Sequence, residues 1–234
     1  MSRLTDADLV RKEYESEAAL SVRAGAYRWA DGPDSIAMCV AAVAEVSPAR
    51  VLDVGCGRGN IAERVAAETA ADVVGVDQSE RMVELTRARG IEAVVGDVRR
   101  LPFEDGSFDC ALAAWMLFHV DDVDAALAEI ARVLTPGGRL VAATNSQSNM
   151  RELRRLVGAP EPEFTFSLEN GSEQLRRRFR RVERRDAVGS LRFPDRAAIQ
   201  EYVDAAITFS GRIPDDVPEP FVVARSSCVF VADL

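Results

Sequence analysis

Cationic side chains other than arginine are scarce in this chain of 234 residues. It has one lysine, Lys12, and one histidine, His119, and its acidic residues give a formal net charge of −9. Proteins that grip nucleic-acid backbones usually carry the opposite sign, because each phosphate contact needs a cation. We therefore expect no nucleic-acid partner.

Long apolar runs and paired cysteines are missing as well. No segment approaches the ~18 consecutive apolar residues of a membrane-spanning helix. The first 17 residues are charged and lack the apolar core of a secretory signal. The four cysteines lie far apart, at positions 39, 56, 110 and 228, without metal-ligand spacing. The sequence predicts a cytoplasmic protein with reduced thiols, no metal site and no membrane partner.

Strands and helices are predicted to alternate between residues 50 and 145. Short apolar runs and helical periodicity give strands at 51–54, 73–77, 93–95, 107–113 and 139–143, and helices at 61–68, 79–89 and 121–134. Near-continuous apolar strands joined by helices are typical of a parallel sheet covered on both faces. Ligands of such sheets bind at the carboxyl ends of the strands, so the residues that follow each strand are the candidate site.

The flanking segments are less regular. Residues 1–47 have helical periodicity, and residues 222–231 form an apolar stretch long enough for a strand that closes the sheet. The arginine-rich segment 176–185 predicts a solvated helix face followed by an edge strand. The expected organisation is a single domain, 1–234, with a helical cap (1–47), a cofactor-binding core (48–146) and a substrate-side insert with closing strands (147–234).

A glycine-rich turn follows the first predicted strand. Its sequence is Asp53-Val54-Gly55-Cys56-Gly57-Arg58-Gly59. Alternate glycines let the backbone turn sharply and approach a ligand closely. Glycines alone also fit a tight turn in any α/β protein, or the dinucleotide site of an NAD-dependent enzyme. Two features favour another adenosine cofactor: the spacing is GxGxG rather than GxGxxG, and the acid at Asp53 suits an ammonium group better than a pyrophosphate.

Acidic and small residues end the next three predicted strands. Asp77 lies 20 residues after Gly57, where a carboxylate can accept hydrogen bonds from both hydroxyls of a ribose. Asp97 follows the third strand and can accept a hydrogen bond from an exocyclic amine. Ala113 and Ala114 end the fourth strand and leave room beside a ligand. The set predicts a site for adenosine that carries an amino-acid group.

Four segments carry a resemblance to a known family. They are VLDVGCGRGN (51–60), GVDQSERM (75–82), GDVRRLPFEDGSFD (96–109) and ARVLTPGGRLVAATN (131–145). In order and spacing they resemble the motifs of class I S-adenosylmethionine-dependent methyltransferases, more narrowly the small-molecule group that includes the ubiquinone and menaquinone enzymes. The resemblance implies an α/β, Rossmann-like, doubly wound sheet of seven mostly parallel strands. Its final strand would be antiparallel, with helices on both faces and a helical N-terminal lid.

The resemblance also implies the cofactor, S-adenosylmethionine, with S-adenosylhomocysteine as the product and no metal. The residues it assigns are Gly55, Cys56 and Gly57 along the methionine portion, Asp53 orienting the loop, Asp77 on the ribose, Gln78 and Met82 against the adenosine, Asp97 and Val98 on the adenine, and the carbonyl of Ala113 or Ala114 on the ammonium group. Core packing is an alternative role for Met82, and a purely structural role is an alternative for Asp53.

The methyl acceptor is expected beyond the fourth strand. There His119 is the candidate general base for an acceptor that arrives protonated, and a structural role near Phe118 is its alternative. Trp115 is expected to line the acceptor pocket. Further acceptor contacts are expected from Tyr14, Arg23, Tyr27, Trp29, Phe164 and Phe166, with ordinary packing of a helical lid as the alternative for each.

The predicted activity is methyl transfer to an O, N or C atom of a small aromatic or apolar metabolite. The Asn/Asp-Pro-Pro-aromatic signature of many nucleic-acid and protein-glutamine methyltransferases is absent, because Ala-Ala-Trp-Met stands at 113–116. A catalytically silent S-adenosylmethionine-binding protein and an NAD-dependent Rossmann enzyme are the alternatives.

Overall fold

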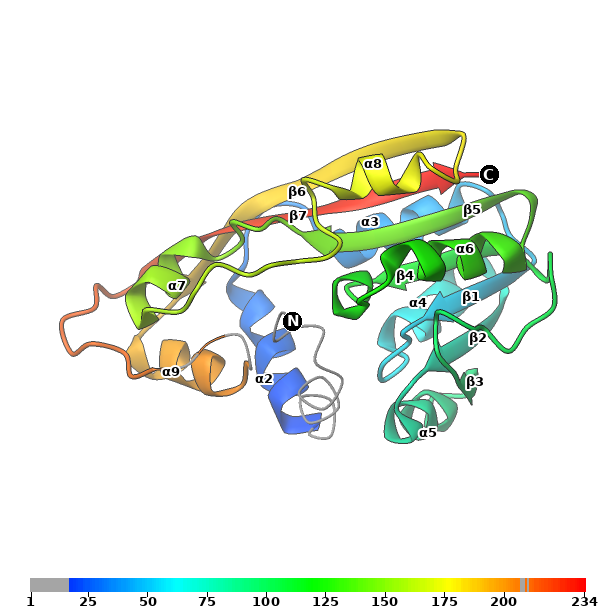
Figure 1. Cartoon of the computed structure of the whole chain (residues 1–234). Coiled ribbons are helices and arrows are strands. Elements are labelled where there is room, and N and C mark those ends of the chain that lie inside the picture. Colours follow the sequence, from blue (N-terminus) through cyan, green and yellow to red (C-terminus); the bar gives the residue numbers. More distant parts are fainter. Residues whose placement is uncertain (1–16, 207–208, 210) are drawn as a thin grey trace.

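The chain folds around one seven-stranded sheet, shown in Figure 1. The computed structural model describes residues 17–206, 209 and 211–234. The strands lie in the order β3-β2-β1-β4-β5-β7-β6, with β7 antiparallel to both neighbours and the other adjacent pairs parallel. Their bounds are β1 Arg50–Val54, β2 Asp72–Asp77, β3 Glu92–Val95, β4 Phe108–Ala114, β5 Leu134–Asn145, β6 Arg181–Phe193 and β7 Phe221–Asp233.

Helices cover both faces of this sheet. On one face, Val43 and Val65 share a buried cluster with Leu112 of β4, and on the other Ile130 packs with Leu140 of β5. The helix bounds are α2 Glu17–Ala26, η1 Tyr27–Trp29, α3 Ser35–Ala44, α4 Asn60–Thr69, α5 Glu80–Ala88, η2 Leu117–His119, α6 Val123–Val133, α7 Arg151–Val157, α8 Gly171–Leu175 and α9 Arg196–Asp204. Layers and topology confirm the expected fold class. None of the helices in the described part of the chain is long and apolar enough to cross a membrane.

The start of β5 differs from the prediction. The expected turn at residues 136–138 lies inside the strand. The register between β4 and β5 shifts there, because Phe108 pairs with Leu134 while Cys110 pairs with Arg139. Gly137, at φ +80°, supplies a left-handed backbone that few other residues adopt. The Pro-Gly-Gly sequence therefore forms an irregularity within a continuous strand.

A two-stranded extension projects past the carboxyl edge of the parallel strands. β5 ends at Asn145, opposite Ser227 of β7. Beyond this pair, residues 188–193 of β6 and 221–226 of β7 continue to pair, which at about 3.3 Å per residue carries the hairpin ~20 Å further. We call these two segments the β6–β7 arm. The sequence predicted the closing strand but not the length of β6.

Helices from both ends of the chain pack on the β6–β7 arm and form a cap at this edge (Figure 1). Their contacts make a hydrophobic core separate from those of the sheet. It includes Ala26 of α2, Leu153 of α7, Leu191 and Phe193 of the arm, and Ile199 of α9. The N-terminal helix and the C-terminal insert are therefore one packed unit.

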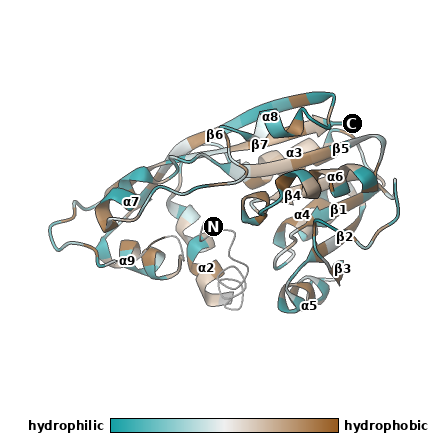
Figure 2. Ribbon diagram, viewed as in Figure 1, coloured by the Kyte–Doolittle hydropathy of each residue, from teal (hydrophilic) through white to brown (hydrophobic). Residues whose placement is uncertain are grey.

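The strand β6 forms one edge of the sheet, and the part of it that runs beside α8 is largely hydrophilic in Figure 2. Charged side chains on an edge strand oppose unwanted pairing with other strands. The expected edge strand begins at Arg181. The expected helix face is wrong, because residues 176–178 form a turn after α8.

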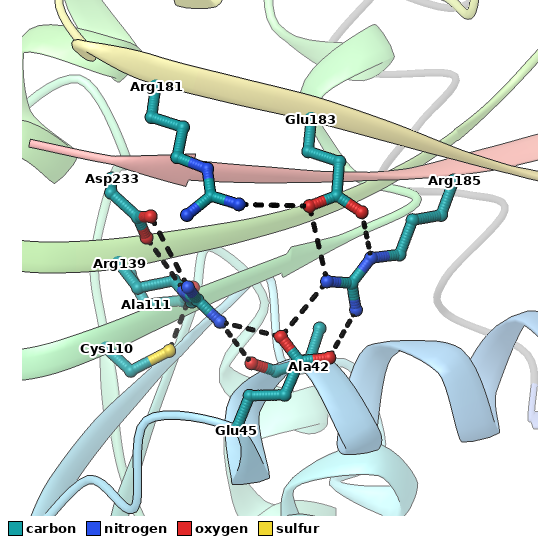
Figure 3. Close-up of polar contacts among 9 residues, drawn as sticks. All are labelled: Ala42, Glu45, Cys110, Ala111, Arg139, Arg181, Glu183, Arg185 and Asp233. Atoms are coloured by element: carbon teal, nitrogen blue, oxygen red, sulfur yellow. Dashed lines mark hydrogen bonds and ion pairs between the residues drawn. The ribbon is translucent and has the colours of Figure 1, made fainter.

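An ion-pair network joins α3 to the last strands at the end of the sheet opposite the cap (Figure 3). Arg139 contacts Asp233 at 2.8 Å and Glu45 at 3.0 Å. Arg185 contacts Glu45 at 2.6 Å and Glu183 at 2.8 Å. Most exposed ion pairs contribute little stability, but the Arg139 side chain is only 11% exposed. The network therefore fixes α3 against β5, β6 and β7.

Candidate functional site

The glycine-rich loop after β1 combines close packing with open space. Gly55, Gly57 and Gly59 have φ of +68°, +53° and +76°, in the left-handed region that glycine adopts without steric penalty. A Cβ on Gly55 would lie 2.8 Å from the Cβ of Met116, whereas a Cβ on Gly57 would meet nothing within 4 Å. The loop thus passes directly against the segment after β4 at Gly55 and leaves room for a ligand at Gly57.

Asp77, at the end of β2, holds this loop in place. Its Oδ2 accepts a hydrogen bond from the Gly57 amide at 2.9 Å, and its Oδ1 accepts one from the Ser79 amide at 2.9 Å. Burial raises the pKa of the Asp77 carboxyl, and these backbone hydrogen bonds oppose the rise. Each carboxylate oxygen has a second lone pair. Asp77 can therefore still accept hydroxyl donors.

Asp53 is a buried acid on β1, two residues before Gly55. Only 3% of the Asp53 surface is exposed. Burial raises the pKa of this carboxyl to about 8, and the negative charge of Asp77 adds to the rise. A cation placed beside the carboxyl would reverse this shift by stabilising the ionised form. The site thus favours a ligand with a positive group near Asp53.

The side chains of two other predicted cofactor contacts pack within the protein. Cys56 points at β2, where a Cβ on Gly75 would lie 2.8 Å from its Sγ. Burial raises the pKa of the Cys56 thiol to about 12, so it remains a neutral thiol at pH 7. Met82 is fully buried on α5, which fits its alternative role in core packing. Gln78, by contrast, is exposed directly after β2.

Asp97 is held by an arginine that the sequence analysis did not single out. The Arg99 guanidinium contacts it through Nη2 and Oδ2 at 2.7 Å and through Nε and Oδ1 at 3.1 Å. This pairing holds the pKa of the Asp97 carboxyl below its usual range. Arg99 also contacts Asp121 at 2.8 Å. A base amine at Asp97 would therefore share the carboxylate with Arg99, while the neighbouring Val98 is buried.

The segment after β4 turns sharply after Ala114 and rests on the glycine-rich loop. Trp115 has φ of +54°, an uncommon conformation for a large side chain. Its amide donates to the Ala143 carbonyl at 2.9 Å. The turn places Met116 against Gly55. The two elements that would contact cofactor and acceptor are thus directly packed.

An aromatic cluster lies beside this turn. Phe118 and Phe164 are buried with ring centroids 5.0 Å apart, and Trp115 packs against them. We call these three residues the aromatic wall. His119 is half-buried on η2, with its ring 4.5 Å from that of Phe118. The structure therefore brings Trp115, His119 and Phe164 together, and their roles toward an acceptor stay predictions.

Gln147 fixes Phe164 in this wall, and sequence reasoning missed it. Its Nε2 donates to the Phe164 carbonyl at 3.2 Å, and its Oε1 accepts from the Phe164 amide at 3.1 Å. The hydroxyl of Thr165 donates to the Leu117 carbonyl at 3.4 Å. No motif marks Gln147, because its partner is a backbone segment 17 residues away.

The predicted N-terminal contacts lie on the cap. Tyr14 falls outside the described residues, and Arg23 lies on α2. Tyr27 is 45% exposed, and its ring centroid is 5.9 Å from the Arg225 guanidinium carbon. Trp29 packs against Phe193 of the arm, with ring centroids 6.2 Å apart. Thus Tyr27 and Trp29 belong to the cap.

Phe166 does not face an acceptor site. Its ring is fully buried in the core of the sheet, 5.7 Å from the Phe230 ring. The expected acceptor contact of Phe166 is therefore wrong. Phe164, two residues earlier in the same loop, lies in the aromatic wall instead.

A direct contact joins the cap to the glycine-rich loop. Arg58 Nη1 donates to Ser21 Oγ on α2 at 2.8 Å. The N-terminal helix therefore reaches the candidate cofactor loop from the cap side.

Comparisons with known proteins agree with this geometry. Residues 52–142 match a family model described as a methyltransferase domain. A demethylmenaquinone methyltransferase from Symbiobacterium thermophilum is 38% identical over 114 residues, 44% of this chain and 45% of the relative. A ubiquinone biosynthesis O-methyltransferase from Xanthomonas oryzae is 37% identical over 127 residues, 51% of this chain and 53% of the relative. Residues 52–142 are therefore similar to a methyltransferase domain, the family whose motifs the sequence resembles.

A solved structure shares its fold with most of the chain. It is an S-adenosylmethionine-dependent methyltransferase from Thermotoga maritima, titled a possible histamine N-methyltransferase. The superposition covers 89% of this chain and 91% of the Thermotoga chain, with a TM-score of 0.55 and 24% sequence identity. This likeness shows a shared fold. The chain spans about half the length of the two curated relatives named above.

Proposed function

We propose that this chain transfers the methyl group of S-adenosylmethionine to an O, N or C atom of a small aromatic or apolar metabolite. The observation that carries the proposal is the contact between Met116 and Gly55. It sets the aromatic wall beside a loop that has the acids and open space for the cofactor. The names of the two curated relatives support a small organic acceptor.

The chain's own residues would hold the cofactor by complementary charge and hydrogen bonds. Asp77 would accept the ribose hydroxyls, and Asp53 would stabilise the positive amino-acid end near the Gly57 turn. S-adenosylmethionine supplies a methyl group on a positively charged sulfur, open to direct displacement. Positioning of this kind can be worth about 7–11 kcal/mol of the reaction barrier.

The aromatic wall and His119 would act on the acceptor. A flat ring stacked on Trp115 and Phe164 would lose water and be held in one plane. His119 would accept a proton from a phenol or ammonium acceptor, a step that matters only when the acceptor arrives protonated.

Calorimetry with S-adenosylhomocysteine and with NAD tests the cofactor. We expect saturable binding of S-adenosylhomocysteine, its loss in Asp77→Ala, and no binding of NAD. Asp72→Ala, an exposed acid at the other end of the same strand, is the matched control and should bind as the parent does. Binding of NAD without S-adenosylhomocysteine would refute the proposal.

Radiolabelled methyl transfer then tests the activity. A panel of phenols, hydroquinones and aromatic amines should contain an acceptor whose labelling requires the intact aromatic wall. Binding of S-adenosylhomocysteine with no transfer to any member would favour the silent binding protein.

A further inference from the structure

A partly open cavity of about 250 Å³ lies between α2, η1 and α9 within the cap. Its walls include Gly25, Ala26, Trp29, Ala198, Glu201 and Tyr202. A protein cavity of ~150 Å³ lined by apolar side chains can bind benzene. This cavity therefore has room for an aromatic ring and a small polar head.

Two opposite charges line the cavity from different elements. The Arg28 guanidinium on η1 lies 4.0 Å from the centroid of the Trp29 ring, and Glu201 lies on α9. Within the part of the chain that the structure describes, no ion pair joins Arg28 and Glu201 to each other or to a third residue. Both charges are thus available to a ligand in the cavity.

This pattern selects the charge of the ligand. A carboxylate binds an arginine by parallel, charge-assisted hydrogen bonds, and an ammonium group pairs with a carboxylate by charge-assisted hydrogen bonds without that two-pronged geometry. A ligand with a single charge would satisfy one wall and meet repulsion from the other. A ligand that carries both signs satisfies both walls, while Trp29 and Tyr202 offer aromatic surface to its apolar part.

We propose that the cavity between α2 and α9 binds a small zwitterion of the aromatic amino-acid class. Its carboxylate contacts Arg28, its ammonium group contacts Glu201, and its ring lies in the apolar space beside Trp29. Ser21 also lines the cavity and accepts the Arg58 hydrogen bond from the glycine-rich loop. The site is therefore adjacent to the candidate cofactor loop, but its occupation does not depend on methyl transfer.

Calorimetric titration with L-phenylalanine, benzylamine and benzoate tests the proposal. L-phenylalanine should bind saturably in the millimolar range or tighter, and the two singly charged probes should bind at least tenfold more weakly. Arg28→Met should weaken L-phenylalanine and benzoate at least tenfold, and Glu201→Gln should weaken L-phenylalanine and benzylamine to the same extent. Ala198→Leu, which fills the cavity without changing its charge, should abolish binding of all three.

Matched controls are Arg177→Met and Glu173→Gln, an exposed ion pair on and after α8. They should leave every titration unchanged. The proposal is overturned if L-phenylalanine fails to bind the parent at millimolar concentration, or if it binds Arg28→Met and Glu201→Gln as it binds the parent. Transfer of labelled methyl to L-phenylalanine would identify the ligand as an acceptor, and binding without transfer would identify it as an effector. Separate titration with S-adenosylhomocysteine distinguishes failure at this site from failure of the cofactor assignment.

Discussion

The buried acid Asp53 should make the folded protein less stable as the pH rises. An unfolded chain ionises this carboxyl near pH 3.9, whereas the folded protein holds its pKa at about 8 because of burial and the nearby Asp77. Between these values the unfolded state has released the proton and the folded state has not. The loss of folding stability that Asp53 causes is therefore absent below about pH 4, grows with pH, and is complete above about pH 8.

Asp53→Asn removes this penalty, so its stability advantage over the parent should depend on pH. Each pH unit in the window changes the free energy of unfolding by about 1.4 kcal/mol. From pH 6 to pH 8 the advantage of Asp53→Asn should widen by roughly 2–3 kcal/mol. At about 2–4 °C per kcal/mol for a chain of this size, the melting temperatures should separate by a further ~5–10 °C.

Urea denaturation at pH 6, 7 and 8 measures this effect. Asp72→Asn is the matched control, because its carboxylate is exposed and its stability should follow that of the parent at each pH. A difference between Asp53→Asn and the parent that stayed constant with pH would refute the reasoning. If Asp53 faces the ammonium group of the cofactor, S-adenosylhomocysteine should release a proton on binding the parent below pH 8 and none on binding Asp53→Asn. Titration in two buffers of different ionisation enthalpy detects that proton.

Three further substitutions test the site and the cap. Gly55→Ala places a Cβ 2.8 Å from Met116 and should destabilise the ligand-free fold by more than the ~1–2 kcal/mol of a left-handed backbone, which urea denaturation measures. Gly57→Ala meets no protein atom and should cost the ligand-free fold only that backbone strain, but its Cβ enters the space left for the cofactor and should weaken S-adenosylhomocysteine binding, which calorimetry measures. Gln147→Ala removes both hydrogen bonds to Phe164 and should raise KM for the acceptor several-fold while the Kd for S-adenosylhomocysteine stays unchanged; an equal loss of both would contradict its role in the wall. Gly189→Ala would place a Cβ 2.3 Å from the Asp31 carbonyl oxygen and should destabilise the fold by about 2–4 kcal/mol. A melting temperature equal to that of the parent would show that β6 and the Asp31 segment are not tightly packed at Gly189.

The sequence was sufficient to predict the sheet because its strands are short, apolar and separated by helical periodicity. The loop between Asp53 and Gly59 and the acids Asp77 and Asp97 were predictable for a related reason. They lie at strand ends, and the carboxyl ends of parallel strands meet at one edge. Local pattern and tertiary position therefore coincide for these residues.

The arm and the acceptor side were not predictable in the same way. The thirteen-residue length of β6 depends on pairing with β7, a partner that lies far along the chain. Gln147 bonds to backbone atoms of Phe164, and no sequence motif marks such a contact. Arg99 donates two hydrogen bonds to the Asp97 carboxylate, and their closeness in sequence does not by itself predict this side-chain geometry. Phe164 and Phe166 are two residues apart and alike in composition, yet one lies in the wall and the other in the core.

The glycine-rich loop identifies the methyl donor and not the acceptor, because its contacts lie apart from those of the acceptor side. Its conformation is determined by atoms within the sheet: Gly55 and Cys56 donate to the Val76 carbonyl, and Gly57 donates to Asp77. The acceptor side is built instead from a turn at Trp115, a segment held by Gln147, and a cap whose helices come from both ends of the chain. Each of these parts can change without disturbing the hydrogen bonds that the loop makes to Val76 and Asp77 of β2. A change of acceptor therefore requires substitutions in the wall and the cap, while the loop and its acids can remain as they are.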